Sequence, residues 1–85
     1  MSIKIYGSES CVQCADAKQY LESKNVAYEY VDVFKDQDAI EKLISRGFST
    51  LPVIMTSNEK SYSVGFDVST IDELIKEENY NARYK

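Results

Sequence analysis

The chain has 85 residues, enough for one modest hydrophobic core and too few for two domains. Its 14 acidic and 10 basic residues give a formal net charge of −4, and the sequence shows no basic cluster, which disfavours nucleic-acid binding. No apolar run approaches the ~20 residues of a membrane span. We therefore predict one domain over residues 1–85, with a core at about 2–77 and a polar tail at 78–85.

The first predicted element is a short strand in which Ile3 and Ile5 share one face. After a polar turn, a helix is predicted from about Val12 to Lys24, with Asn25 as a left-handed stop. Apolar side chains recur on one face of this helix, at Cys14, Ala17, Tyr20 and Leu21. The two cysteines of the chain therefore lie at a strand-to-helix junction.

The β-branched and aromatic run at 27–34 predicts a second strand. A second helix is predicted from Asp36 to Gly47, because its first turn is acidic and glycine ends helices. Its buried stripe is expected to contain Ala39, Ile40, Leu43 and Ile44. The remaining predicted elements are a strand at 51–55, a hairpin turn at 56–60, a strand at 61–64 and a helix at about 68–77.

The predicted element order is βαβαββα. The early strand–helix–strand crossover makes the first two strands parallel, and the late hairpin makes the last two antiparallel. We therefore predict an α/β fold of thioredoxin-like architecture, with a four-stranded mixed sheet and helices on both of its faces.

The segment Cys11-Val12-Gln13-Cys14 holds the only two cysteines. At a helix start, unpaired N–H groups and the helix dipole should stabilise a thiolate at Cys11 and lower its pKa below the ordinary ~8.5. Cys14, one turn further on, can close a disulfide with Cys11. The pattern predicts thiol–disulfide exchange, in which Cys11 attacks and Cys14 resolves the mixed disulfide.

Cysteine pairs at this spacing also occur in zinc sites, in static disulfides and as ordinary buried thiols. A structural zinc site needs four ligands, and this chain has no histidine and no third cysteine. A disulfide across two residues closes a small loop and adds little stability. The strand-to-helix context favours redox activity over all three alternatives.

Pro52 is the only proline and begins an apolar strand. It is either an ordinary strand-start proline or, in a protein with a redox cysteine pair, a cis-proline. A cis bond would turn the Leu51 N–H and C=O toward the sulfurs, where a peptide or glutathione could pair as an added strand. Further on, Gly65-Phe66-Asp67 either caps a helix or offers N–H groups, a carboxylate and an exposed ring to a polar partner.

Three motifs, in this order and at these spacings, resemble the glutaredoxin family: Cys11-Val12-Gln13-Cys14, Gly47-Phe48 with Leu51-Pro52-Val53-Ile54, and Gly65-Phe66-Asp67. The resemblance covers about residues 2–77. Within the family, the Val-Gln pair between the cysteines is most similar to the NrdH-redoxins. Those small proteins supply electrons to ribonucleotide reductase and are recharged by thioredoxin reductase.

The resemblance implies that Cys11 is the nucleophile, Cys14 the resolving thiol and Pro52 a cis-proline. The predicted substrate-binding set is Gln13, Thr50, Leu51, Pro52, Gly65, Phe66 and Asp67. The predicted protein is thus an enzyme, a dithiol oxidoreductase that reduces protein disulfides, with no metal and no permanently bound cofactor. We expect a cytoplasmic monomer, in the host cytoplasm if a phage encodes it.

Two alternatives within the family stay open. Asp67 matches the members that use glutathione, so glutathione is the alternative reductant. Against it, the Val-Gln pair replaces their usual Pro-Tyr, and negative charge at Glu9 and Asp16 would repel the carboxylates of glutathione. The other alternative is an iron–sulfur carrier that holds a cluster between two chains through one cysteine of each. Such carriers more often have a single cysteine at the site, so the presence of Cys14 disfavours this alternative.

Overall fold

The computed structural model describes the backbone of residues 2–84 and the side chains of residues 2–79. The elements are, in order, β1 Ile3–Gly7, α1 Val12–Ser23, β2 Tyr28–Asp32, α2 Gln37–Ser45, β3 Val53–Met55, β4 Tyr62–Val64 and α3 Val68–Tyr84. This is the predicted order βαβαββα.

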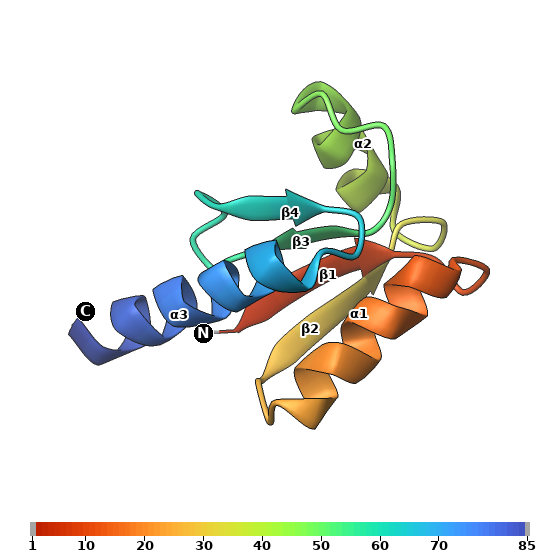
Figure 1. Ribbon diagram of the computed structural model, residues 1–85. Helices are drawn as coiled ribbons and strands as arrows, with labels where there is room; N and C mark the ends of the chain where they lie inside the picture. Colours follow the sequence, from red (N-terminus) through yellow and green to blue (C-terminus); the bar gives the residue numbers. More distant parts are fainter. Residues whose placement is uncertain (1, 85) are drawn as a thin grey trace.

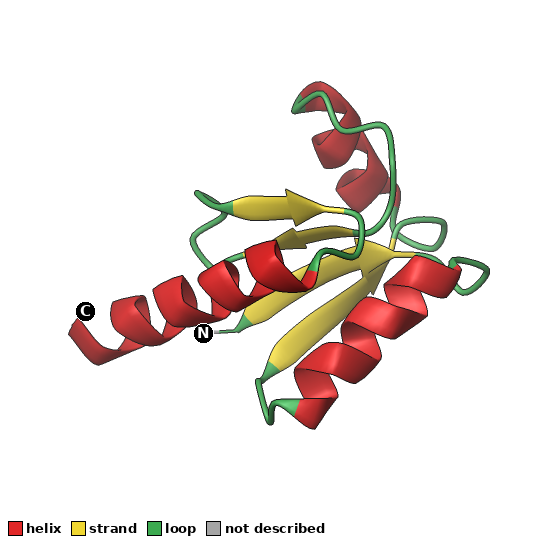
Figure 2. Cartoon of the chain, viewed as in Figure 1, coloured by secondary structure: helices red, strands yellow, loops and turns green. Residues whose placement is uncertain are grey.

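The strands form one four-stranded sheet in the order β2-β1-β3-β4 (Figure 1). Strands β1 and β2 are parallel, whereas β3 is antiparallel to both β1 and β4. Helices α1 and α3 cover one face of the sheet and α2 covers the other, as Figure 2 shows. The prediction of a mixed sheet with helices on both faces, in a thioredoxin-like fold, is confirmed.

Each face of the sheet has its own buried cluster, because side chains alternate along a strand. One cluster contains Ile3 and Ile5 of β1 with the apolar faces of α1 and α3. The other contains Tyr6 of β1 with Ala39 and Leu43 of α2. The helical face predicted for α1 is also observed, since its buried residues are Cys14, Ala17 and Leu21.

The buried stripe predicted for α2 is wrong at one position. Ala39 and Leu43 are buried and Ile40 packs beside them, but the Ile44 side chain is 65% exposed. Ile44 follows Leu43 directly, about 100° further round the helix, which turns it away from a face centred on Leu43. Strand β3 is also shorter than predicted, because the ladder begins after Pro52, whose nitrogen has no hydrogen to donate.

The largest difference from the prediction concerns the C-terminal segment. Helix α3 does not end near Glu77 but continues to Tyr84, and Glu78 is buried. The segment after Glu77 contains no glycine or proline that would stop the helix. The side chains of residues 80–85 lie outside the described part of the chain. Within the described residues, no helix combines the length and apolar character needed to cross a membrane.

Candidate active site

Cys11 and Cys14 form a disulfide at the start of α1. Cys11 is the N-cap residue, in extended conformation, and its Sγ accepts a hydrogen bond from the Cys14 backbone N–H at 3.1 Å. Their Cα atoms are 5.2 Å apart. The two sulfurs differ in access, because Cys11 is half-buried and Cys14 is fully buried. An incoming thiol can therefore approach Cys11 but not Cys14.

The loop before Cys11 is held by hydrogen bonds to the carbonyl oxygen of Ser8. The Cys11 N–H donates to it at 3.3 Å, and the Tyr30 hydroxyl donates to it at 3.1 Å. Gly7, the last residue of β1, lies directly against the cysteine pair. A Cβ atom at Gly7 would stand 2.7 Å from Cys14 Sγ and 2.7 Å from Tyr30 Oη. Only glycine leaves room for the buried cysteine at this point.

Gly7 and Tyr30 were not among the site residues predicted from the sequence. The contact depends on the parallel register of β1 and β2, in which Ile5 pairs with Tyr30 and Gly7 with Asp32. The alternation of apolar residues predicts the faces of both strands but not this register. The one sequence signal for this contact is the glycine that ends β1.

The charge near the cysteines is more balanced than the sequence suggested. Glu9 lies in the loop before Cys11, and its Oε1 is 3.0 Å from the Nζ of Lys35. Hydrogen bonding to Glu9 is the main cause that raises the pKa of Lys35 above its ordinary value. Both side chains are exposed, so solvent screens the pair. Asp16 is exposed on α1.

The Leu51–Pro52 peptide bond is cis, and Pro52 is buried. Strand β3 pairs Val53 with Tyr6 of β1, so continuing that antiparallel register places Pro52 opposite Gly7. The Pro52 carbonyl accepts a hydrogen bond from the Gly65 N–H at 2.8 Å. Pro52 therefore links the glycine turn to the end of β1 that carries the cysteine loop.

The turn before α3 also contacts the first turn of α1. The Gln13 side-chain oxygen Oε1 accepts a hydrogen bond from the Phe66 backbone N–H at 3.2 Å. The structure thus brings Gln13, Pro52 and the Gly65–Asp67 turn together with the cysteine pair. In Figure 1, the connections that carry these residues lie at one end of the sheet.

Phe66 was expected to be exposed, but it is half-buried. Its ring packs edge-to-face against Tyr20 of α1, with the ring centroids 6.1 Å apart. Asp67 is exposed at the start of α3, where its Oδ2 accepts a hydrogen bond from the Thr70 hydroxyl at 3.0 Å. Its backbone carbonyl accepts from the Ile71 N–H at 2.9 Å. Asp67 therefore caps the helix and still presents its carboxylate to solvent.

The exposed Thr50 and half-buried Leu51, also predicted to bind substrate, line a separate hollow of about 260 Å³ beside α2. Its apolar walls include Phe34, Ile44 and Phe48. Thr50 and Leu51 directly precede Pro52 in sequence, but neither cysteine lines this hollow.

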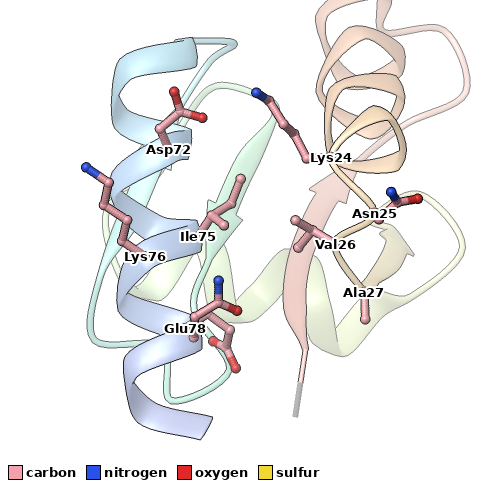
Figure 3. Close-up of a pocket in the computed structure, with 9 residues that line it drawn as sticks. Lys24, Asn25, Val26, Ala27, Asp72, Ile75, Lys76 and Glu78 are labelled. Carbon is pink, nitrogen blue, oxygen red and sulfur yellow. The ribbon is translucent and has the colours of Figure 1, made fainter. Parts of the chain in front are cut away.

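A cavity of about 480 Å³ lies between the C-terminal end of α1 and helix α3. Figure 3 shows Lys24, Asn25, Val26 and Ala27 on one side of it, facing residues of α3. Because Cys11 caps the opposite end of α1, this cavity is not part of the cysteine site. Within the described residues, no three Cys, His, Asp or Glu side chains gather as metal ligands would.

A sequence model of the family described as Glutaredoxin matches residues 3–61. The chain belongs to the glutaredoxin family. It is 40% identical over 74 residues to the glutaredoxin-like protein NrdH of Salmonella typhimurium, a match that covers 87% of this chain and 89% of the relative. It is 37% identical over 75 residues to a glutaredoxin-like 8.6 kDa protein of Clostridium pasteurianum, covering 87% of this chain and 97% of that one.

The structure is also similar to that of NrdH-redoxin from Escherichia coli, described as a glutaredoxin-like protein with a thioredoxin-like activity profile. The TM-score is 0.80 at 32% identity, and the match covers 87% of this chain and 95% of that one. This glutaredoxin-family chain is thus an NrdH-like thiol–disulfide oxidoreductase with a Cys11–Cys14 pair.

Proposed function

We propose that this protein reduces disulfides of client proteins, with Cys11 as the nucleophile and Cys14 as the resolving thiol. The observation that carries the assignment is the difference in access between the two sulfurs. Cys11 is half-buried at the helix start, where the Cys14 N–H at 3.1 Å would stabilise a thiolate, whereas Cys14 is fully buried. A client disulfide can reach only the first of them.

The reaction proceeds in two exchanges. The Cys11 thiolate attacks a client disulfide, one client sulfur leaves as a thiolate, and a mixed disulfide joins Cys11 to the other client sulfur. The Cys14 thiolate then attacks Cys11 Sγ, which forms the Cys11–Cys14 disulfide and releases the second client thiolate. Two electrons pass to the client, and an external thiol reductant must return them to the oxidised protein.

The client would be held by the residues gathered around Pro52. Leu51 and Thr50, on the segment before β3, offer backbone groups with which an extended client segment could pair. Gln13 and the Gly65–Asp67 turn would border the same position from α1 and α3. Ribonucleotide reductase is the proposed client, on the strength of the NrdH relatives.

Thioredoxin reductase is the proposed reductant. The Phe66 N–H, to which a carboxylate of glutathione could bind in the Gly65–Asp67 turn, already donates to Gln13. The related Escherichia coli NrdH-redoxin is described as having a thioredoxin-like activity profile. Glutathione is the second candidate, because the Asp67 carboxylate is exposed at this turn. The protein would act as a cytoplasmic monomer without a permanently bound cofactor.

The roles of the cysteines can be tested with two single substitutions and the same client. Cys11→Ser should abolish disulfide reduction, whereas Cys14→Ser should accumulate a mixed disulfide between Cys11 and oxidised ribonucleotide reductase, visible by mass spectrometry. Retention of activity by the Cys11→Ser protein would refute the assignment.

The reductant is tested on the oxidised wild-type protein in two parallel assays. One contains NADPH and thioredoxin reductase, and the other contains NADPH, glutathione and glutathione reductase. Turnover in the first assay alone supports the proposal. Turnover in the second alone would make the protein a glutathione-dependent glutaredoxin.

A further inference from the structure

The hydroxyl of Tyr30 lies beside the buried sulfur of Cys14. Both Tyr30 Oη and Cys14 Sγ are 2.7 Å from the point where Gly7 would carry a Cβ atom. The two atoms are therefore separated by no more than twice that distance, across a gap that exists because residue 7 is glycine. Tyr30 lies on β2, the strand that pairs with β1, and Cys14 lies on the buried face of α1.

Cys14 has a particular need for a hydrogen-bond donor during turnover. When a reductant thiolate attacks Cys11 Sγ, the bond between the two protein sulfurs breaks and its electron pair goes to Cys14, which leaves as a thiolate. Cys14 is 0% exposed, so water cannot stabilise that charge directly. Among the hydrogen bonds of residues 2–79, the Cys14 N–H donates to Cys11 Sγ, and no group donates to Cys14 Sγ.

We propose that the Tyr30 hydroxyl is the donor that stabilises the Cys14 thiolate once the disulfide opens. In the disulfide form this hydroxyl donates to the Ser8 carbonyl oxygen at 3.1 Å. Rotation of the O–H bond, with a small shift of the two side chains as the disulfide opens, would bring the same hydrogen to Cys14 Sγ. The proposal rests on the role of Cys14 as the resolving thiol given above.

The surroundings of Tyr30 keep its hydroxyl protonated and its ring in place. Burial, followed by the negative charges of Asp32 and Glu9, raises the pKa of Tyr30 above its ordinary value of 10.0. On the α1 side, the Lys18 Nζ lies 5.3 Å from the centre of the Tyr30 ring, in cation–π geometry. The phenol therefore remains a donor throughout the range in which thiols titrate.

The hydrogen bond would act in both directions of the reaction. It makes Cys14 a better leaving group when the protein is recharged, and it increases the fraction of Cys14 thiolate available to resolve a mixed disulfide. Because it exists only in the reduced form, it also shifts the redox equilibrium of the pair toward the dithiol. Tyr30 would thus help to set the potential of this protein.

The test uses Tyr30→Phe, which keeps the ring and removes only the hydroxyl. In a Cys11→Ser background Cys14 is the single thiol, and its ionisation is followed by the ¹³Cβ chemical shift of labelled cysteine. We expect Tyr30→Phe to decrease the acid dissociation constant of Cys14 about three- to tenfold, the effect of losing one hydrogen bond of ordinary net strength. Tyr28→Phe is the matched control, since Tyr28 lies two residues earlier on β2 and is half-buried. It should leave the titration unchanged.

A second measurement separates this role from anchoring of the Ser8 loop. With both cysteines present, the ratio of dithiol to disulfide in a thiol redox buffer should fall about three- to tenfold in Tyr30→Phe. If the loop resonances move while the Cys14 titration and the redox ratio stay at wild-type values, Tyr30 is a loop anchor only and the proposal is wrong. The proposed function is tested by a different result: it fails if the Cys11→Ser protein still reduces disulfides, whatever Tyr30→Phe does.

Discussion

The Gln13 side chain and the Phe66 backbone are joined by a hydrogen bond, with 3.2 Å between Oε1 and N, although the residues are 53 positions apart. This bond ties the first turn of α1 to the turn that precedes α3. It also occupies an N–H group that the carboxylate of a small peptide could otherwise bind. Gln13 is therefore placed to disfavour glutathione in this turn.

The first prediction follows from this bond. Gln13→Ala frees the Phe66 N–H, and we expect the rate of reduction by glutathione to rise about threefold, which corresponds to one modest hydrogen bond. The measurement is NADPH consumption coupled through glutathione reductase. Gln19→Ala, at an exposed position of the same helix, is the control and should leave the rate unchanged. A lower rate in Gln13→Ala would mean that Gln13 itself binds glutathione.

The second prediction concerns the space beside Gly7. In Gly7→Ala the new Cβ would lie 2.9 Å from Cys14 Cβ and closer still to Cys14 Sγ, so the helix start must shift. We expect the free energy of unfolding of the oxidised protein, measured in urea, to fall by about 1 to 3 kcal/mol. The rate of disulfide reduction should fall as well, because the cysteine pair is displaced.

Gly47→Ala is the matched control for this substitution. Gly47 has a φ of +86°, but a Cβ there would meet nothing within 4 Å. Its replacement should therefore cost only the backbone strain of a left-handed alanine, about 1 kcal/mol, and leave disulfide reduction unchanged. Equal losses of activity in the two variants would contradict a role for the space beside Gly7.

Much of the fold follows from local sequence patterns. Alternation in β1, helical spacing at Cys14, Ala17 and Leu21, and the stops at Asn25 and Gly47 are properties of neighbouring residues. Asn25 and Gly47 indeed have positive φ angles of 57° and 86°. The cysteine pair was recognisable for the same reason, since its spacing and its position before a helix are both local.

The contacts that complete the site are not local. The register of two parallel strands brings the Tyr30 hydroxyl to the space beside Gly7 that Cys14 also borders, and Lys35 contacts Glu9, 26 residues earlier in the chain. Periodicity predicts which face a residue occupies but not which atom it touches across the sheet. The end of α3 was missed for a related reason, because a charged residue such as Glu78 is expected in solvent unless a distant partner binds it.

The third prediction tests that distant partner. Glu78 is only 6% exposed, and its two carboxylate oxygens accept hydrogen bonds from the Ser57 N–H and hydroxyl, each at 2.7 Å. Glu78→Ala removes the partner of the half-buried Ser57 N–H and hydroxyl, so the free energy of unfolding should fall by about 2 kcal/mol. Glu73→Ala, whose contact with Lys76 is exposed and 3.9 Å long, should change it by less than about 0.5 kcal/mol. Equal losses of unfolding free energy in Glu78→Ala and Glu73→Ala would show that the hydrogen bonds of Glu78 do not stabilise the fold.

The fourth prediction concerns Glu59, whose carboxylate lies among Lys4, Lys42 and Arg46. The hydrogen bond from Lys42 is the largest cause that lowers the pKa of Glu59 below its ordinary value of 4.5, and Lys4 adds to it. A carboxyl whose pKa is lower in the folded state stabilises the fold above its unfolded pKa. That stabilisation is lost as the pH falls through the folded-state pKa.

Glu59→Gln should therefore lower the free energy of unfolding by about 1 to 2 kcal/mol at neutral pH. The difference from wild type should shrink below pH 4.5 and disappear once the wild-type carboxyl is protonated in both states. Urea unfolding at a series of pH values measures this directly. Glu41→Gln, at an exposed position on α2, should show no such pH dependence. A Glu59→Gln difference that persists undiminished in acid would mean that packing, and not charge, explains the contribution of Glu59.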